Sequence, residues 1–115
     1  MDTRKQVREH FIKAGMPTVD KAMLTAKYDV MRSKQNHDGC VVFIHGYGSH
    51  GNGGAICIEF RKWINSQLSK GKVKCVINGE DFSIFNFKAL ELKNKYKGLD
   101  GLMDRYNHGV TIVEL

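Results

Sequence analysis

The sequence predicts an α/β sandwich in which strands and helices alternate in the order β-α-β-α-β-α-β. Two observations carry this prediction. Apolar residues recur at helical spacing in three stretches, and short runs rich in β-branched residues separate those stretches. At 115 residues, the chain is long enough for one domain with one buried core, and we expect a single domain over residues 1–115.

The first half of the chain is predicted to form a strand, a helix and a second strand. Residues 6–13 alternate poorly and give a weak first strand. Thr18 is placed to cap a helix that runs to about Ser33. Its buried face is predicted from spacing, and comprises Val19, Ala22, Met23, Ala26, Val30 and Met31. Residues 40–44, all apolar, then read as a buried strand.

The second half repeats this alternation. An amphipathic helix is expected to end near Leu68, and a strand follows over residues 73–77. We expect Asp81 or Ser83 to cap a third helix over residues 83–97. Its inner face is predicted to hold Phe85, Ala89, Leu92 and Tyr96. A long connection, helical in part, then leads to a final strand over residues 110–115.

Residues 45–54, which join the strand at 40–44 to the next helix, contain five glycines among ten residues. Glycine allows positive φ angles and close approach of another molecule to the backbone. The free amides at the start of the following helix favour an anion such as a phosphate. We therefore place the functional site in this loop.

Three known loop patterns fit poorly. Residues 46–51 match G-x-G-x-x-G, but no acidic residue follows at the offset that a dinucleotide-binding fold needs, since Asp81 lies too late. An α/β-hydrolase needs the elbow G-x-S-x-G, and Tyr47 stands where its first glycine should be. A P-loop needs a lysine where Asn52 stands.

A fourth pattern fits better. His45-Gly46-Tyr47-Gly48, the helix start Ala55-Ile56 and the basic turn at residues 61–64 resemble the Smr (small MutS-related) domain. Residues 109–113 are similar to the closing G-x-T-x-V strand of that family, and residues 17–22 are similar to the start of its first helix. The resemblance implies a two-layer fold, a four-stranded mixed sheet with two main helices on one face. The third helix would then be an addition before the last strand.

The resemblance also implies a function, with one departure. The family's L-D-x-H-G motif should precede Pro17, but residues 10–16 hold only its glycine, so the motif is degenerate. In the family the D-x-H pair is linked to nuclease activity. The resemblance therefore supports a loop that faces nucleic acid better than it supports endonuclease (nicking) activity, which stays open. Mg²⁺ or Mn²⁺ is expected only if the chain is a nuclease, and no metal ligand is predicted.

Composition agrees with a polyanionic partner. Eighteen Lys and Arg against twelve Asp and Glu give a net charge of +6, which favours nucleic acid. Cys40, Cys57 and Cys75 form no C-x-x-C pair, so we expect buried free thiols and a cytoplasmic location. No apolar run approaches spanning length and no signal peptide is visible, so no membrane is expected.

The candidate site residues have these expected roles. His45 is the candidate catalytic residue, as general acid or base, although it is as well placed to hold the loop through a backbone carbonyl. Tyr47 can stack on an unpaired base or pack on the neighbouring helix. The other expected nucleic-acid contacts are Gly46, Gly48, Ser49, His50, Gly51, Gly53, Gly54, Arg61, Lys62 and Lys72. The alternative function is binding, or chemistry, of a nucleotide or another phosphorylated molecule at the same loop.

Overall fold

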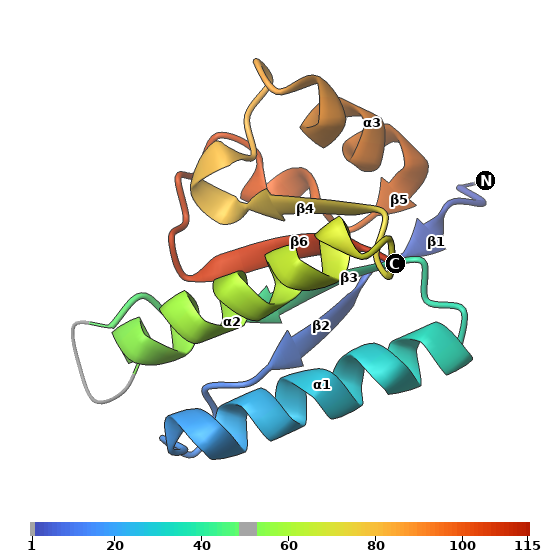
Figure 1. The fold of residues 1–115 in the computed structure, drawn as a ribbon. Coiled ribbons are helices and arrows are strands. Elements are labelled where there is room, and N and C mark those ends of the chain that lie inside the picture. Colours follow the sequence, from blue (N-terminus) through green and yellow to red (C-terminus); the bar gives the residue numbers. More distant parts are fainter. Residues whose placement is uncertain (1, 49–52) are drawn as a thin grey trace.

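A four-stranded mixed sheet forms the centre of the computed structural model, which describes residues 2–48 and 53–115 (Figure 1). The strand order is β2-β3-β6-β4. β2 runs parallel to β3, and β6 runs antiparallel to both of its neighbours, β3 and β4. This confirms the predicted sheet. Its strands are β2 (Arg8–Phe11), β3 (Cys40–Ile44), β4 (Cys75–Asn78) and β6 (Val110–Glu114).

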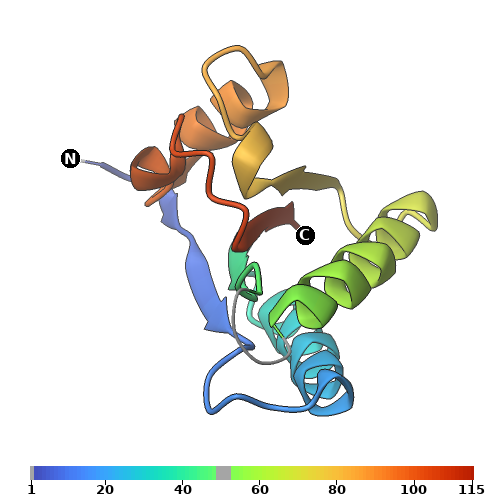
Figure 2. The same ribbon diagram turned by 90° about the vertical axis from the view of Figure 1, so that its left-hand side faces the viewer.

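Two helices of equal length cover one face of this sheet, as predicted. They are α1 (Val19–Gln35) and α2 (Gly53–Ser69), which lie together on one side in Figure 2. Thr18 caps α1 by accepting a hydrogen bond from the Lys21 amide, as its position predicted. The helices share a core with the sheet that includes Ile12, Ala22, Ala26, Val30, Val41, Phe43, Ile56, Phe60, Ile64, Val73 and Val113.

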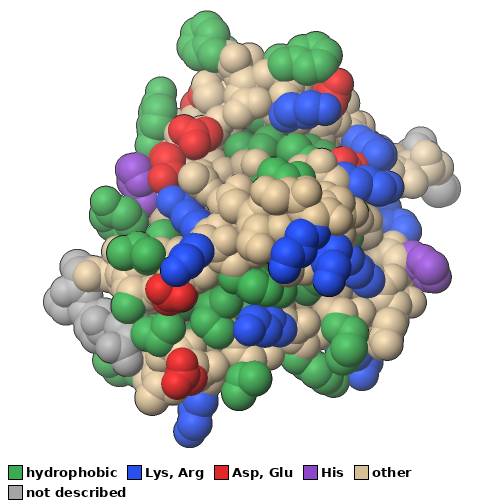
Figure 3. All heavy atoms as spheres, viewed as in Figure 1, with side chains coloured by type: hydrophobic (Ala, Val, Ile, Leu, Met, Phe, Trp, Pro, Cys, Tyr) green, Lys and Arg blue, Asp and Glu red, His purple; other side chains and the backbone are tan. Residues whose placement is uncertain are grey.

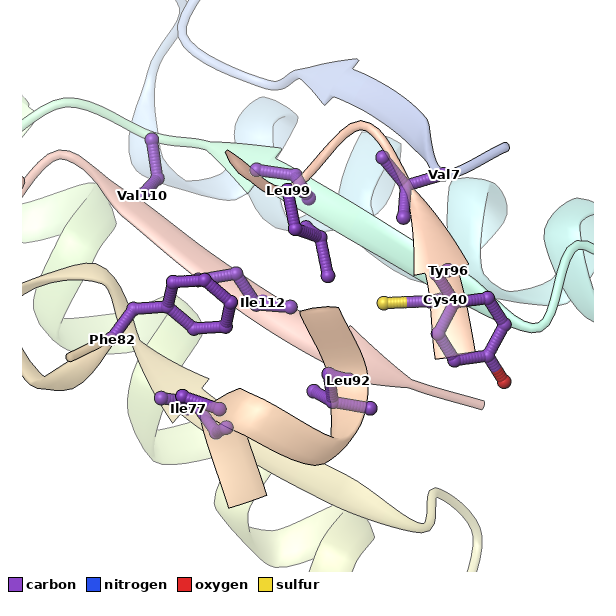
Figure 4. Close-up of a cluster of buried hydrophobic side chains, with 11 residues drawn as sticks. Val7, Cys40, Ile77, Phe82, Leu92, Tyr96, Leu99, Val110 and Ile112 are labelled. Atoms are coloured by element: carbon purple, nitrogen blue, oxygen red, sulfur yellow. The ribbon is translucent and has the colours of Figure 1, made fainter. Parts of the chain in front are cut away.

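The opposite face is covered by the segment between β4 and β6. It contains η1 (Gly79–Asp81), α3 (Phe87–Lys95), β5 (Tyr96–Lys97) and η2 (Asp100–Leu102). A second core fills the space between these elements and the sheet, and Figure 4 shows Phe82, Leu92 and Leu99 converging on Ile112 there. Because both faces are covered, β3 is apolar at every position.

The third helix differs from its prediction at both ends. It begins at Phe87, where Asn86 caps it by accepting a hydrogen bond from the Ala89 amide, so neither Asp81 nor Ser83 is the cap. Phe85, predicted on the buried face, is 92% exposed, while Phe82 fills the core instead. The helix ends at Lys95 because the next two residues pair as β5 with β1. These choices depend on partners that are distant in sequence.

The amino-terminal region is also more divided than predicted. Instead of one strand over residues 6–13, the chain forms β1 (Lys5–Gln6) and β2, with Val7 buried between them. β1 leaves the main sheet to pair in parallel with β5. In α1, Met31 is 49% exposed rather than buried, because the inward stripe continues through Val30 to Ser33.

Two further predictions concern thiols and membranes. Cys40, Cys57 and Cys75 are free, as expected; the first two are buried and the third is half-buried. Among the residues that the structure describes, no helix is both long and apolar enough to cross a membrane.

Candidate nucleic-acid interface

The loop that follows β3 is anchored to the start of β6. Both the His45 and the Gly46 amides donate hydrogen bonds to the Gly109 carbonyl, each at 3.0 Å. The two backbones touch closely, since a methyl group added to Gly109 would lie 3.4 Å from the Cα of Gly46. The predicted loop therefore begins where β3 and β6 meet, at the end of the sheet.

The ring of His45 is buried and both of its nitrogens have partners. Nδ1 lies 2.7 Å from the Gly46 carbonyl oxygen and Nε2 lies 2.8 Å from Oγ1 of Thr111. A carbonyl oxygen only accepts, so the proton is on Nδ1, and Nε2 accepts from the Thr111 hydroxyl. Burial lowers the pKa of His45 to about 4. His45 is therefore a neutral residue that holds the loop.

The side chain of Arg61, on α2, forms several hydrogen bonds within the protein. Its guanidinium forms a two-pronged ion pair with Glu80, with both N···O distances at 2.8 Å. It also donates to Oγ1 of Thr111 at 3.1 Å and to the carbonyl oxygens of His108 and Val110. Partial burial acts to raise the pKa of Glu80, but the hydrogen bonds and charge of Arg61, a backbone hydrogen bond and the hydrogen bond to His108 together lower that pKa. The charge of Arg61 is thus balanced inside the protein.

An exposed aromatic pair lies beside this ion pair. The Tyr47 ring, whose residue is 65% exposed, lies 4.8 Å from the ring of His108. Nδ1 of His108 lies 3.2 Å from Oε2 of Glu80, so the carboxylate that binds Arg61 also orients this second histidine. We refer to Tyr47 and His108 together as the aromatic pair. It presents ring surface to solvent at the rim of the loop.

The loop approaches the first turn of α2 and a nearby lysine. A methyl group on Gly54 would lie 3.6 Å from the Tyr47 carbonyl oxygen, and one on Gly46 would lie 3.1 Å from Cδ of Lys13. No acidic residue occupies the first turn of α2. Gly46 and Gly48 have φ angles of +75° and +95°, which glycine adopts without strain. A helix start without an acidic side chain, a glycine backbone and an exposed lysine therefore meet here.

The other predicted site residues are more scattered. Lys62 is exposed, but it lines a groove between α1 and α2 that also holds Asp20, Glu59 and Trp63. Lys72 follows the far end of the 17-residue α2, roughly 25 Å from its start at 1.5 Å per residue. The structure therefore does not bring Lys72 to the loop. Ser49, His50 and Gly51 lie outside the described residues, and Gly53 begins α2.

Two residues of the site were missed by the sequence analysis. Lys13 and His108 were given no role, although His108 directly precedes the Gly109-Val110-Thr111 segment that carried part of the resemblance. That adjacency was the one available signal for His108. Within the described ranges, no group of three or more His, Cys, Asp or Glu side chains is placed to hold a metal ion.

Comparison with known proteins bears on the fold. No protein-family model matches the sequence, and no curated protein matches it. The structure is similar to the crystal structure of the Smr domain of Thermus thermophilus MutS2, with 18% sequence identity and a TM-score of 0.59. The match covers 95% of this chain and 98% of that domain. The chain has an Smr-like fold.

In this Smr-like chain, three of the segments that carried the resemblance lie together. The H-G-x-G segment leaves β3, the T of the G-x-T-x-V segment bonds the histidine of H-G-x-G, and the arginine of the basic helical turn bonds that same threonine. The three motifs thus form one hydrogen-bonded unit. Because identity is low, the comparison establishes the architecture, and function depends on the residues of the site.

Proposed function

We propose that this Smr-like domain binds nucleic acid, with the loop that starts at His45 against the sugar-phosphate backbone. The observation that carries the proposal is the contact between that glycine-rich loop and the start of α2. Backbone amides at a helix start attract phosphate, and no acidic side chain of the first turn opposes them here. The net charge of +6 adds general attraction for a polyanion.

The side chains of the site divide into two roles in this proposal. Lys13 and Lys62 are exposed and supply attraction that does not depend on base sequence. Tyr47, with His108 behind it, offers a surface on which an unpaired base can stack. His45 and Arg61 are positioning residues, since each is already saturated by bonds within the protein.

Cleavage of the bound strand is a further possibility at the same site, and the degenerate D-x-H motif argues for binding without it. His45 has no exposed nitrogen with which to exchange a proton. An assay for the proposed binding therefore includes Mg²⁺ and Mn²⁺, so that nicking is recorded when it occurs. Binding of a mononucleotide at the same loop is the competing function.

The test is fluorescence polarisation with labelled single-stranded RNA, single-stranded DNA and branched DNA over a salt series. We expect affinity to rise with strand length and to fall steeply with salt. Lys13→Ala is expected to weaken binding and to reduce the slope of log K against log salt by about 0.7 on a single strand. Lys88→Ala, an exposed lysine on α3, is the matched control and should bind as the parent does.

Two results would contradict the proposal. One is the absence of binding to any of the three nucleic acids at low salt. The other is tight binding of a mononucleotide that does not improve as the strand lengthens, which would favour the phosphorylated-ligand alternative. Equal loss in the Lys13→Ala and Lys88→Ala variants would show that net charge alone, and not the loop, drives the association.

A further inference from the structure

β4 is an open edge of the main sheet. Among the described strands it pairs only with β6, so one side of its backbone has no strand beside it. Proteins usually protect such edges with charged side chains, proline or bulges. Residues 75–78 are Cys-Val-Ile-Asn and hold neither a charge nor a proline. The charge and the irregular pairing are confined to Lys74 before the strand, whose amide donates to Glu114, the pairing partner of Cys75. This edge is therefore competent to accept another strand.

The ladder fixes which backbone groups of β4 face outward. The Leu115 amide donates to the Gly39 carbonyl and the His45 amide donates to the Gly109 carbonyl, so odd-numbered residues of β6 bond to β3. In an antiparallel ladder the alternate residues bond to the other neighbour. The even-numbered residues Glu114 and Ile112 of β6 therefore bond to β4, where they pair with Cys75 and Ile77. The N–H and C=O groups of Val76 and Asn78 consequently point away from the sheet.

A groove lies along these outward groups. It has a volume of about 220 Å³, and β4 forms its floor. Asn65 of α2 lines one wall, and Asn86 and Lys88 line the other, at the start of α3. The two helices cover opposite faces of the sheet, so a strand entering between them would continue the sheet.

Exposed apolar side chains flank this groove. Asn86 in the groove wall lies between Phe85 and Phe87, which are 92% and 72% exposed, and Ile84 is 52% exposed. Figure 3 shows hydrophobic side chains standing out from the end of the molecule where Figure 1 places α3. Two neighbouring phenylalanines this exposed are typical of a surface that meets a partner.

Charge indicates the occupant. Lys88 lines the groove, Lys74 directly precedes β4, and Lys70 and Lys72 precede Lys74, against Asp81 as the one acidic residue in the groove lining. We propose that β4 binds an extended acidic segment of a partner protein, which adds as a fifth strand with its apolar side chains against Phe85 and Phe87. A second copy of this chain fits less well, because each copy has a net charge of +6 and would bring another basic surface rather than an acidic strand.

This surface is independent of the proposed nucleic-acid binding, and its test uses the intact protein. The probe is a fluorescein-labelled peptide of alternating valine and glutamate, and its control is the same peptide with lysine in place of glutamate. We expect the valine–glutamate peptide to bind, with salt-sensitive affinity. In ¹⁵N NMR spectra, the amide signals of Val76 and Asn78 should shift, and their hydrogen exchange should slow.

Variants separate the apolar from the charged contribution. Phe85→Ala/Phe87→Ala removes exposed rings without touching the core, and should weaken the affinity for the valine–glutamate peptide roughly tenfold. Leu24→Ala, an exposed apolar residue of α1, is its control. Lys74→Glu/Lys88→Glu should abolish binding, whereas Lys21→Glu/Lys27→Glu, with the same change in net charge on α1, should leave most of it.

Several outcomes would overturn the proposal. They are no binding of the valine–glutamate peptide, equal binding of the valine–lysine peptide, and NMR shifts that map away from β4. A fourth is a concentration-dependent dimer in analytical ultracentrifugation that Phe85→Ala/Phe87→Ala dissociates, because a second copy would then be the occupant.

Discussion

Oγ1 of Thr111 lies 2.8 Å from Nε2 of His45, and it accepts a hydrogen bond from Arg61 on its other side. One hydroxyl on β6 thereby joins the histidine of the loop to the arginine of α2. The hydroxyl donates to the neutral histidine and accepts from the guanidinium, so its single proton and one of its lone pairs are both directed by the fold.

Thr111→Val keeps the shape of the side chain and removes this hydroxyl. It leaves Nε2 of His45 and Nε of Arg61 without their shared partner, and we expect the free energy of unfolding to fall by about 1–3 kcal/mol. Urea unfolding followed by circular dichroism measures the change. Thr25→Val, at an exposed position of α1, should change stability by much less; similar losses in both variants would contradict a special role for Thr111.

The histidine makes stability depend on pH. His45 has an ordinary pKa near 6.5 in the unfolded chain and about 4 in the folded protein, so it binds a proton more readily when unfolded. Below pH 6.5 the unfolded state therefore gains protons first. We expect stability to fall as the pH drops from about 6.5 to 4, by on the order of 3 kcal/mol at 1.4 kcal/mol per pKa unit.

His45→Gln tests that expectation. The variant has no group at this position that titrates in the range, so its stability curve should be flatter between pH 6.5 and 4. Some slope should remain, because burial also lowers the pKa of His10. The Glu80 carboxyl, whose pKa is lowered in the folded protein, contributes stability above its ordinary pKa that is lost at more acidic pH. An unchanged slope in His45→Gln would show that the histidine does not titrate as described.

The ion pair between Arg61 and Glu80 is predicted to organise the site rather than to bind phosphate. Glu80→Gln leaves the guanidinium without its counter-charge in a half-buried position, and should destabilise the fold and weaken nucleic-acid binding together. The same should hold for Arg61→Gln. A double-mutant cycle on thermal stability should give a coupling energy of about 1–3 kcal/mol. If Arg61→Gln weakened binding while leaving stability intact, the arginine would contact the ligand directly.

The backbone of the loop requires glycine at position 46. Gly46→Ala places a methyl group at a φ of +75°, 3.1 Å from Cδ of Lys13, and should cost about 1–2 kcal/mol in strain and displace the lysine. Gly71→Ala has nearly the same φ angle, +72°, with no atom within 4 Å. Both variants should lose similar stability, but only Gly46→Ala should weaken nucleic-acid binding. Equal nucleic-acid binding by the two variants would show that the loop is not part of the interface.

Tyr47 is predicted to discriminate unpaired from paired nucleic acid. Tyr47→Ala should weaken single-strand binding by about 1–3 kcal/mol, since it removes a stacking surface, and should leave duplex binding nearly unchanged. Tyr28→Ala on α1 removes another exposed tyrosine and serves as the control. Polarisation assays on a single strand and its duplex measure both, and an equal loss on the two would contradict base stacking.

Elements whose signals are local could be predicted from the sequence. The apolar run of β3 and the cap at Thr18 are each set by residues close along the chain, and the structure has them where they were predicted. Helical periodicity and capping act within a few residues, so they can be read from sequence. The exposure of Phe85 could not be predicted in this way, because the sequence does not reveal that Phe82 occupies the core.

The role of each polar residue of the site depends on contacts that form only in the folded chain. Arg61 was expected to contact nucleic acid, but Glu80, nineteen positions later, neutralises it because the fold places the segment after β4 beside α2. His108 comes to Tyr47 across a separation of sixty-one residues, because β6 pairs with β3. The sequence does not show which residues a charged or aromatic side chain will contact. Their chemistry is set by burial and by neighbours that only the folded sheet brings together.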